Sequence, residues 1–311
     1  MRQPAYLITE VDEAILRALA RFHYLTAAQA SRLLYPKLLD ANRYMQRRLK
    51  KLTDSEYVLR LRALPVPQYG QAPHVFTLGR RGRQYTTAAG VARRSYFRPS
   101  EEHRAAHNSP FMAHRLATID VMIAAVSLCR DLPVLCPQLL SERELKRGAV
   151  HVEVPPGPHS TGGAGKAVAV IPDAWFQLAV AGDAPISIAV ELDRATEDQK
   201  VWREKVAAYA YWAEGPYQEA FETDNLTIAV VCPSNTRVSV LADWTMRELK
   251  SRNLSQLADI LLFTATSPVS ASPAQFFFDA HWRSANEPTT VKLLETPVPL
   301  HEGSGVVFRT V

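Results

Sequence analysis

The chain has 311 residues, of which 47% are hydrophobic and 22% are charged, which is typical of a globular protein with room for two cores. We find no uncharged apolar run of about 18 residues, and the first residues, MRQPAYLITEVDE, carry acids where a signal peptide needs an apolar segment. A cytoplasmic protein without a membrane span is therefore expected. Cys129, Cys136 and Cys232 are spaced for neither a disulfide framework nor a zinc site.

Positive charge is concentrated in the first third of the chain. Residues 1–100 contain 18 Lys and Arg against 6 Asp and Glu, a net charge of +12, whereas the remainder contains 18 against 25, a net charge of −7. Basic side chains that displace counterions from phosphates are the main source of sequence-independent DNA affinity. The asymmetry favours a basic module that binds a polyanion, although a solvated basic surface has the same composition.

The N-terminal segment predicts three helices. The first has apolar residues at helical spacing from Val11 to Phe22. Thr26 and Gln29 have the spacing of a capping box at the start of a short second helix. Asp40 is placed to cap the third, ANRYMQRRLKKL.

The third predicted helix has one apolar and one cationic face. Met45, Leu49 and Leu52 share the apolar face. The opposite face carries Arg43, Gln46, Arg47 and Lys50. In a helix-turn-helix the last helix enters the major groove, so we expect these four side chains to contact double-stranded DNA.

A β-hairpin is predicted after the third helix. Apolar and basic residues alternate in YVLRLRAL, PVPQYGQAP has turn composition, and HVFTL is β-prone. Three helices followed by a hairpin predict a winged helix-turn-helix DNA-binding domain over residues 1–90, with a fold used only for protein contacts as the alternative. Further DNA contacts are expected from the hairpin and the segment after it, at Arg60, Arg62, Arg80, Arg81 and Arg83.

Residues 91–131 are predicted to be a linker and a long connecting helix. The linker is polar and without sustained periodicity. The stretch FMAHRLATIDVMIAAVSL is apolar over much of its circumference, which suits a helix buried between two modules or against a partner. A homodimer is therefore one possible assembly.

Residues 132–311 predict an α/β domain. Strand-like runs occur in AVAVIPDAWFQLAV, ISIAVELD, LTIAVVC and DILLFTA, with helices expected near residues 200–213 and 242–250. This order indicates an α/β sandwich with a mixed sheet, and hence a two-domain chain of the α+β or α/β class.

Three acidic residues lie at the ends of these strands. Glu191 and Asp193 are two residues apart and share a strand face, and Asp173 lies beside them if the two strands are neighbours. Clustered carboxylates repel one another unless a cation lies among them, and Mg²⁺ or Mn²⁺ prefers such oxygen ligands. We predict Asp173, Glu191 and Asp193 as metal ligands.

Lys205 lies among apolar side chains of the following helix and needs an anionic partner. A scissile phosphate is one such partner. An internal ion pair with Glu191 or Asp193 is the other interpretation of the same residues.

These motifs give the chain a resemblance to the replication-relaxation family of plasmids and related mobile elements. The likeness rests on the winged helix, on AHRLATIDVMIA, and on PDAWF followed by AVELDRATED and KVAAYAYW, and it covers most of the chain. It implies a restriction-endonuclease-like second domain, in which a PD-(D/E)xK motif brings a metal and water to the phosphodiester. Asp173 matches the aspartate and Glu191 the middle acid, but Asp193 stands in place of the lysine, for which Lys205 would substitute.

The resemblance implies a double-stranded DNA-binding protein that acts in replication or relaxation of a mobile element, with a replication or mobilisation protein as a further partner. Asp173, Glu191, Asp193 and Lys205 would form the catalytic set. Asp173 and Glu191 would bind the metal, Asp193 would add a ligand or orient water, and Lys205 would stabilise charge in the transition state. The alternatives are a Mg²⁺-dependent endonuclease or nickase and a non-catalytic transcriptional regulator.

Overall fold

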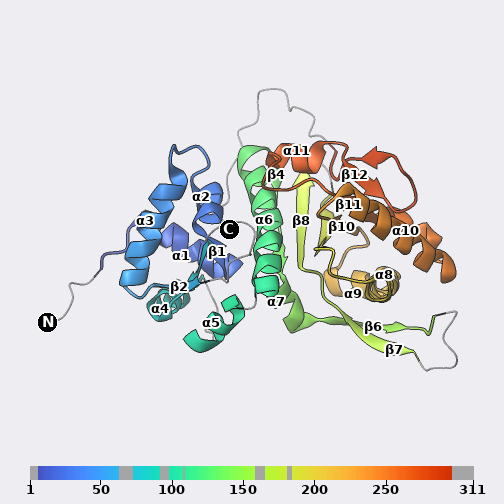
Figure 1. Ribbon diagram of the computed structural model, residues 1–311, viewed down its shortest axis with the longest axis horizontal. Coiled ribbons are helices and arrows are strands. Elements are labelled where there is room, and N and C mark those ends of the chain that lie inside the picture. The colour runs from blue at the N-terminus through green and yellow to red at the C-terminus, as the bar shows by residue number, and fades with distance from the viewer. Residues whose placement is uncertain are drawn as a thin grey trace.

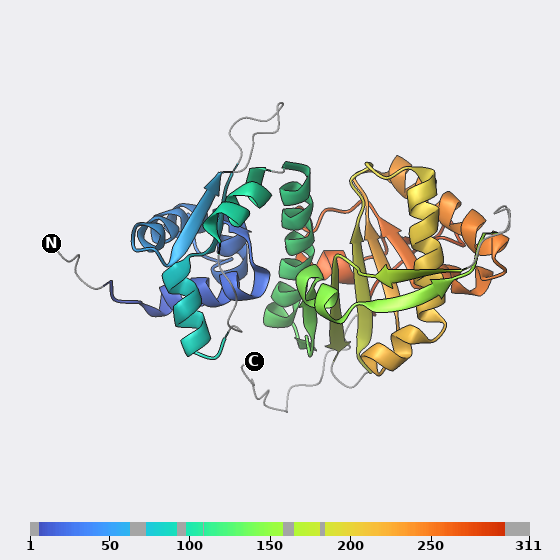
Figure 2. The same ribbon diagram turned by 90° about the horizontal axis from the view of Figure 1, so that it is seen from below.

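The computed structural model describes residues 6–62, 73–91, 98–107, 109–157, 165–180 and 184–295. Two modules lie on opposite sides of the long helix α6 (Ser109–Asp131), one mainly helical and one built on a sheet (Figure 1). The view from below shows the same arrangement, with α6 between them (Figure 2). The chain is of a mixed α and β class, as its sequence predicts.

The N-terminal module contains the predicted helices and hairpin. Its helices are α1 (Glu10–Phe22), α2 (Ala27–Leu34), α3 (Ala41–Asp54) and α4 (Arg80–Ala88). Its strands are β1 (Leu25–Thr26), β2 (Val58–Arg62) and β3 (His74–Leu78), which pair antiparallel in the order β1-β3-β2. The predicted hairpin turn lies outside the described residues. Met45, Leu49 and Leu52 are buried beneath α3, as its apolar stripe predicts.

The predicted capping box of the second helix is confirmed. The Gln29 N–H donates to Thr26 Oγ1 at 3.1 Å and the Thr26 N–H donates to Gln29 Oε1 at 3.0 Å, which completes a capping box for α2. The prediction that the Asp40 side chain caps α3 is wrong, because this side chain makes no capping hydrogen bond. Asp40 has a left-handed backbone with φ of 58°, whereas a capping residue needs an extended backbone.

Helix α6 packs between the two modules. Gln29 Nε2 donates to the Leu116 carbonyl at 2.8 Å and to Asp120 Oδ1 at 2.9 Å, and Arg32 forms an ion pair with Asp120. Buried residues of α1, α6 and the sheet form one continuous hydrophobic cluster. The segment Pro110–Asp131 is long and apolar enough to cross a membrane, but 56% of its most apolar window is buried inside the protein. Its composition is therefore explained by its place in the core. The domain boundaries expected at residues 90 and 131 remain predictions.

A mixed eight-stranded sheet forms the centre of the second module. Its strands are β4 (Val134–Leu135), β5 (Leu139–Ser141), β8 (Ala174–Val180), β9 (Ile186–Leu192), β10 (Thr227–Val231), β11 (Leu261–Thr264), β12 (Trp282–Ser284) and β13 (Thr290–Val291). The order is β13-β12-β11-β10-β9-β8-β4, and β5 also pairs with β8. Strands β9, β10 and β11 are parallel, and the remaining pairs are antiparallel.

Helices cover both faces of this sheet. Helix α6 and α11 (Pro273–Phe278) lie on one face, and α8 (Gln199–Ala213) and α10 (Asn235–Ser251) lie on the other (Figure 1). Both faces of the central strands are therefore buried, which explains why their sequences are almost continuously apolar. The smaller elements are α5 (Pro99–His107), α7 (Glu142–Leu145), η1 (Lys146–Gly148), α9 (Pro216–Phe221), η2 (Ser255–Ile260) and the ribbon of β6 (Val150–Val154) with β7 (Lys166–Val170).

Candidate functional site

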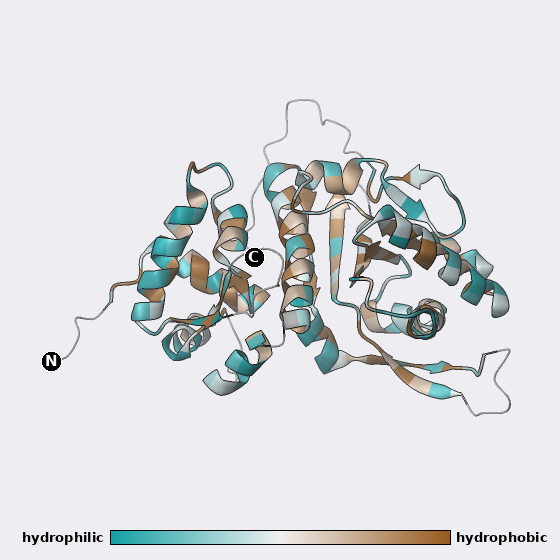
Figure 3. Ribbon diagram, viewed as in Figure 1, coloured by the Kyte–Doolittle hydropathy of each residue, from teal (hydrophilic) through white to brown (hydrophobic). Residues whose placement is uncertain are grey.

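The predicted basic face of α3 is exposed. Helix α3 lies at the outer end of the N-terminal module and is largely hydrophilic (Figures 1 and 3). Arg43, Gln46, Arg47 and Lys50 are all exposed. The side chains of Arg43 and Arg47 make no hydrogen bond or ion pair with any other described residue. The Lys50 side chain pairs with Asp54 at 2.8 Å, one turn further along the helix.

A groove runs between α3 and the hairpin. It has a volume of about 560 Å³ and is lined by Gln46 and Lys50 of α3 and by Arg60 of β2. Arg60 and Arg62 are exposed on β2, and Arg80 is exposed at the first residue of α4. Lys50 of α3 and Arg60 of the hairpin therefore line the same groove.

Two of the predicted DNA contacts lie partly inside the module. Arg81 donates to the Ser55 carbonyl at 3.0 Å, and its guanidinium lies 4.5 Å from the centre of the Tyr57 ring. The Arg83 side chain is only 12% exposed and forms an ion pair with Glu102 at 3.0 Å. Although burial opposes the effect, hydrogen bonds and positive charge around Glu102 lower its pKa to about 2. The sequence did not predict these internal contacts, because Glu102 belongs to α5, in the predicted linker.

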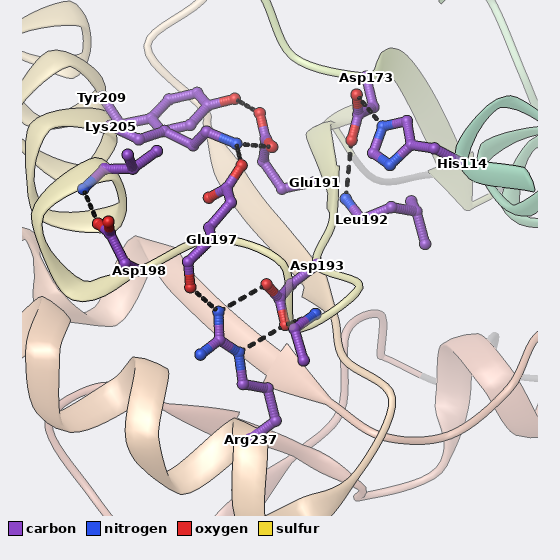
Figure 4. A network of polar contacts seen from close by, with 12 residues as sticks. His114, Asp173, Glu191, Leu192, Asp193, Glu197, Asp198, Lys205, Tyr209 and Arg237 are labelled. Carbon is purple, nitrogen blue, oxygen red and sulfur yellow. Dashed lines mark hydrogen bonds and ion pairs between the residues drawn. The ribbon is translucent and has the colours of Figure 1, made fainter. Parts of the chain in front are cut away.

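The second candidate site lies where β8 begins and β9 ends (Figure 4). Ala174 pairs with Val190, and the Asp173 N–H donates to the Val190 carbonyl at 3.0 Å, so Asp173 lies opposite Glu191. Asp173 Oδ1 lies 2.7 Å from His114 Nε2 of α6, and its Oδ2 accepts the Leu192 N–H at 2.8 Å. The hydrogen bond that His114 donates to Asp173 raises the pKa of His114, although burial opposes it, which favours an imidazolium–carboxylate pair.

The carboxylate of Glu191 points toward α8, away from the side on which Asp173 contacts His114 of α6 (Figure 4). Only 3% of Glu191 is exposed, and its Oε2 accepts from Lys205 Nζ at 2.9 Å, while Tyr209 donates to its Oε1. Lys205 also pairs with Glu197 at 2.8 Å. Burial raises the pKa of Glu191, although the charge of Lys205 opposes it. Burial acts against the charged form of Lys205 as well, but Glu191 and Glu197 outweigh it and raise the pKa of Lys205.

Asp193 is held by an arginine from α10. Arg237 binds both of its carboxylate oxygens, with Nε to Oδ2 at 2.7 Å and Nη2 to Oδ1 at 2.8 Å. Arg237 Nη2 also donates to the Glu197 carbonyl at 2.8 Å, which joins this pair to the Lys205 network. The Asp193 side chain is fully buried, so its charge is neutralised within the protein.

The structure brings Asp173, Glu191 and Lys205 to one end of the sheet, but its contacts divide them. Asp173 lines a cavity of about 270 Å³ beside α6, and Glu191 lines a separate cavity of about 560 Å³ beside α8. Both oxygens of each predicted metal ligand already accept hydrogen bonds from other groups of the chain. A Mg²⁺ or Mn²⁺ ion bound by Asp173, Glu191 and Asp193 would therefore have to displace these partners.

Sequence reasoning missed His114 and Arg237 at this site. His114 lies in the segment AHRLATIDVMIA, where a polar ring on a mostly apolar helix was the available signal. Its partner Asp173 is 59 residues away, so only the packing of α6 against the sheet brings them together. Arg237 had no comparable signal, because it follows the N-cap of an ordinary surface helix.

A protein-family model matches a large part of the chain. The model described as replication-relaxation matches residues 16–226, more than half of the chain. The chain belongs to the replication-relaxation family. The matched region begins within α1 and ends at the residue before β10. It includes His114, Asp173, Glu191 and Lys205, whereas Arg237 lies beyond it. No curated protein and no solved structure matches the chain. Membership of this family suggests a role in replication or relaxation of mobile elements.

Proposed function

We propose that this member of the replication-relaxation family binds double-stranded DNA through α3 and the β2–β3 hairpin, in the manner of a winged helix. The observation that carries the proposal is the exposed basic face of α3, on which Arg43 and Arg47 have no protein partner among the described residues. Such charges are available to displace counterions from DNA phosphates. The protein would thereby act on the DNA of a plasmid or another mobile element.

The chemistry of the face suits the major groove. Arginine forms paired hydrogen bonds with guanine or with phosphate, and glutamine can do so with adenine. Gln46 and Lys50 line the groove that also contains Arg60, so bases and backbone could be contacted together. Arg81 and Arg83 are expected to support this surface from within, because both are engaged by protein groups.

Affinity for duplex DNA tests this proposal. The double variant Arg43→Ala with Arg47→Ala should bind a fluorescent plasmid-derived duplex at least tenfold more weakly than wild type in anisotropy titrations, since each such contact is worth about 1 kcal/mol or more. Lys200→Ala with Lys250→Ala removes two exposed charges from the second module and is the matched control. Equal affinities for the two double variants would place the DNA surface elsewhere.

We further propose that the second module is a restriction-endonuclease-like scaffold. A helix-covered mixed sheet with Asp173 and Glu191 at one end supports the proposal. Metal-dependent endonuclease activity is a second candidate, favoured by the contact between Lys205 and Glu191 at 2.9 Å. Because His114, Lys205 and Arg237 already hold the carboxylates, we favour a DNA-binding accessory protein over a nuclease.

A plasmid assay separates these two candidates. A nuclease would convert supercoiled plasmid to relaxed or linear forms only when Mg²⁺ or Mn²⁺ is present, and Glu191→Ala would abolish the conversion. An accessory protein would bind the plasmid without cutting it, whether or not Mg²⁺ or Mn²⁺ is present. Metal-dependent cleavage by wild type that Glu191→Ala removes would overturn our preference.

A further inference from the structure

A second cationic surface lies between the two modules. It is a cavity of about 490 Å³, lined on one side by α1 and α4 and on the other by α7 and η1. No residue of α3 lines it. The N-terminal module contributes Arg21 and Arg83, and the second module contributes Arg143 and Arg147.

Positive charge in this cavity is only partly neutralised. The Arg83 side chain pairs with Glu102. The side chains of Arg21 and Arg147 are exposed and make no hydrogen bond or ion pair with other described residues. Glu144 is the one acidic residue among the described residues of the lining, and its Oε2 accepts the Ser141 N–H at 2.8 Å and the Ser141 hydroxyl at 2.7 Å. That carboxylate caps α7 and faces an excess of guanidinium groups.

His23 lies in the wall of this cavity, between Arg143 and Glu102. It follows the last residue of α1 with φ of 68°, which turns the chain into the cavity wall. Burial lowers the pKa of His23, and the positive charges of Arg143 and Arg83 act in the same direction, whereas Glu102, whose Oε2 lies 3.4 Å from His23 Nε2, opposes them. Its Nδ1 lies 3.1 Å from Arg143 Nη1, so a neutral ring can accept this hydrogen bond and orient the guanidinium.

We propose that this cavity binds a phosphate-bearing anion between Arg21 of one module and Arg143 and Arg147 of the other. Guanidinium groups match phosphate oxygens through paired hydrogen bonds, and like charges gathered in a concave site gain most from a bound anion. The phosphate belongs either to the backbone of bound DNA or to a free nucleotide. Only the first of these sources rests on the proposed function.

An anion here would also be connected to the sheet-end site. The Glu142 N–H donates to the Asp173 carbonyl at 3.1 Å, one residue before Arg143. The Glu142 side chain pairs with Arg115 of α6 at 2.8 Å. Residues that would hold the anion are therefore adjacent to residues that position Asp173, and the anion would bridge the two modules.

Binding of pyrophosphate and of a duplex by the full chain tests the proposal. Isothermal titration calorimetry at low salt measures pyrophosphate affinity for wild type, for Arg143→Ala with Arg147→Ala, and for the control Lys200→Ala with Lys250→Ala. Both double variants remove two exposed charges, so an effect of net charge alone would be equal in the two. We expect the cavity variant to lose at least tenfold in pyrophosphate affinity and the control to change less than twofold.

Anisotropy titrations with the duplex then identify the source of the phosphate. If the phosphate belongs to the DNA backbone, the cavity variant should also bind the duplex more weakly. Its slope of log affinity against log salt should then be smaller by about 1.8, at roughly 0.9 for each of two lost phosphate contacts. A free nucleotide predicts unchanged duplex affinity and loss of ATP binding. Equal pyrophosphate and duplex affinities in the cavity variant and the control would overturn the proposal. The α3 variants test the proposed function separately, because α3 does not line the cavity.

Discussion

The basic face of α3 and the carboxylates at the end of β9 are both clusters of charge, but their surroundings differ. On α3, Arg43 and Arg47 are exposed and have no partner among the described residues. At the sheet end, Glu191 and Asp193 are buried and each is held by a cationic side chain. An exposed, unpaired cluster is available to bind another molecule. In a buried cluster the ion pairs are needed for stability, because a buried charge without a partner is strongly destabilising.

The largest effect should come from Asp193. Asp193→Ala leaves Arg237 without its bidentate partner in a site where the arginine side chain is 12% exposed. Removing one member of such a buried pair costs roughly 3–5 kcal/mol, so the free energy of unfolding in urea should fall by about that amount. Asp243→Ala breaks an exposed ion pair with Arg247 and should cost less than about 0.5 kcal/mol. A small loss for Asp193→Ala would mean that the acid is available for another role.

Two neighbouring arginines of α3 offer a sharper contrast. Arg48 binds the buried carboxylate of Asp12 at 2.6 Å, whereas Arg47 faces outward. Arg48→Ala should lower the free energy of unfolding by about 2–3 kcal/mol, because a charge-assisted pair is lost. Arg47→Ala should change it by less than about 0.5 kcal/mol and weaken DNA binding instead. If Arg47→Ala proved the more destabilising substitution, the division of α3 into a packing and a binding face would be wrong.

A smaller, pH-dependent effect is expected at His114. Its pKa is higher in the folded protein than in the unfolded chain, because of its hydrogen bond with Asp173. The pair therefore adds stability that is complete below the unfolded value of about 6.5 and is lost as the pH rises through the folded value. His114→Gln should cost about 1–2 kcal/mol at pH 5.5 and less at pH 9, measured by urea unfolding at both values. A cost that grew with pH would show that the neutral ring is the one bound.

Sequence patterns predicted the elements of this chain better than their long-range contacts. The capping box of Thr26, the buried stripe of α3 and the apolar runs of β9 and β10 depend on residues close in the chain, so they could be predicted. The same holds for Glu191 and Lys205, which are joined by one strand-to-helix connection.

The contacts that were missed depend on distant elements. His114 meets Asp173 only because α6 packs on the sheet, and Arg237 reaches Asp193 from a helix 44 residues further along. Arg83 was predicted on the surface because its partner Glu102 is in a segment without clear periodicity. Which charged groups are paired is therefore decided by tertiary packing, and local spacing carries little of that information.

The salt dependence of duplex affinity tests the central claim most directly, namely that α3 binds DNA. The affinity of wild type, of Arg43→Ala with Arg47→Ala and of the control Lys200→Ala with Lys250→Ala would be measured across a series of salt concentrations. If both arginines contact phosphates, the slope of log affinity against log salt should fall by about 1.8 for the α3 variant, at roughly 0.9 per contact, and stay unchanged for the control. A slope for the α3 variant equal to that of wild type, together with equal affinity, would contradict the account.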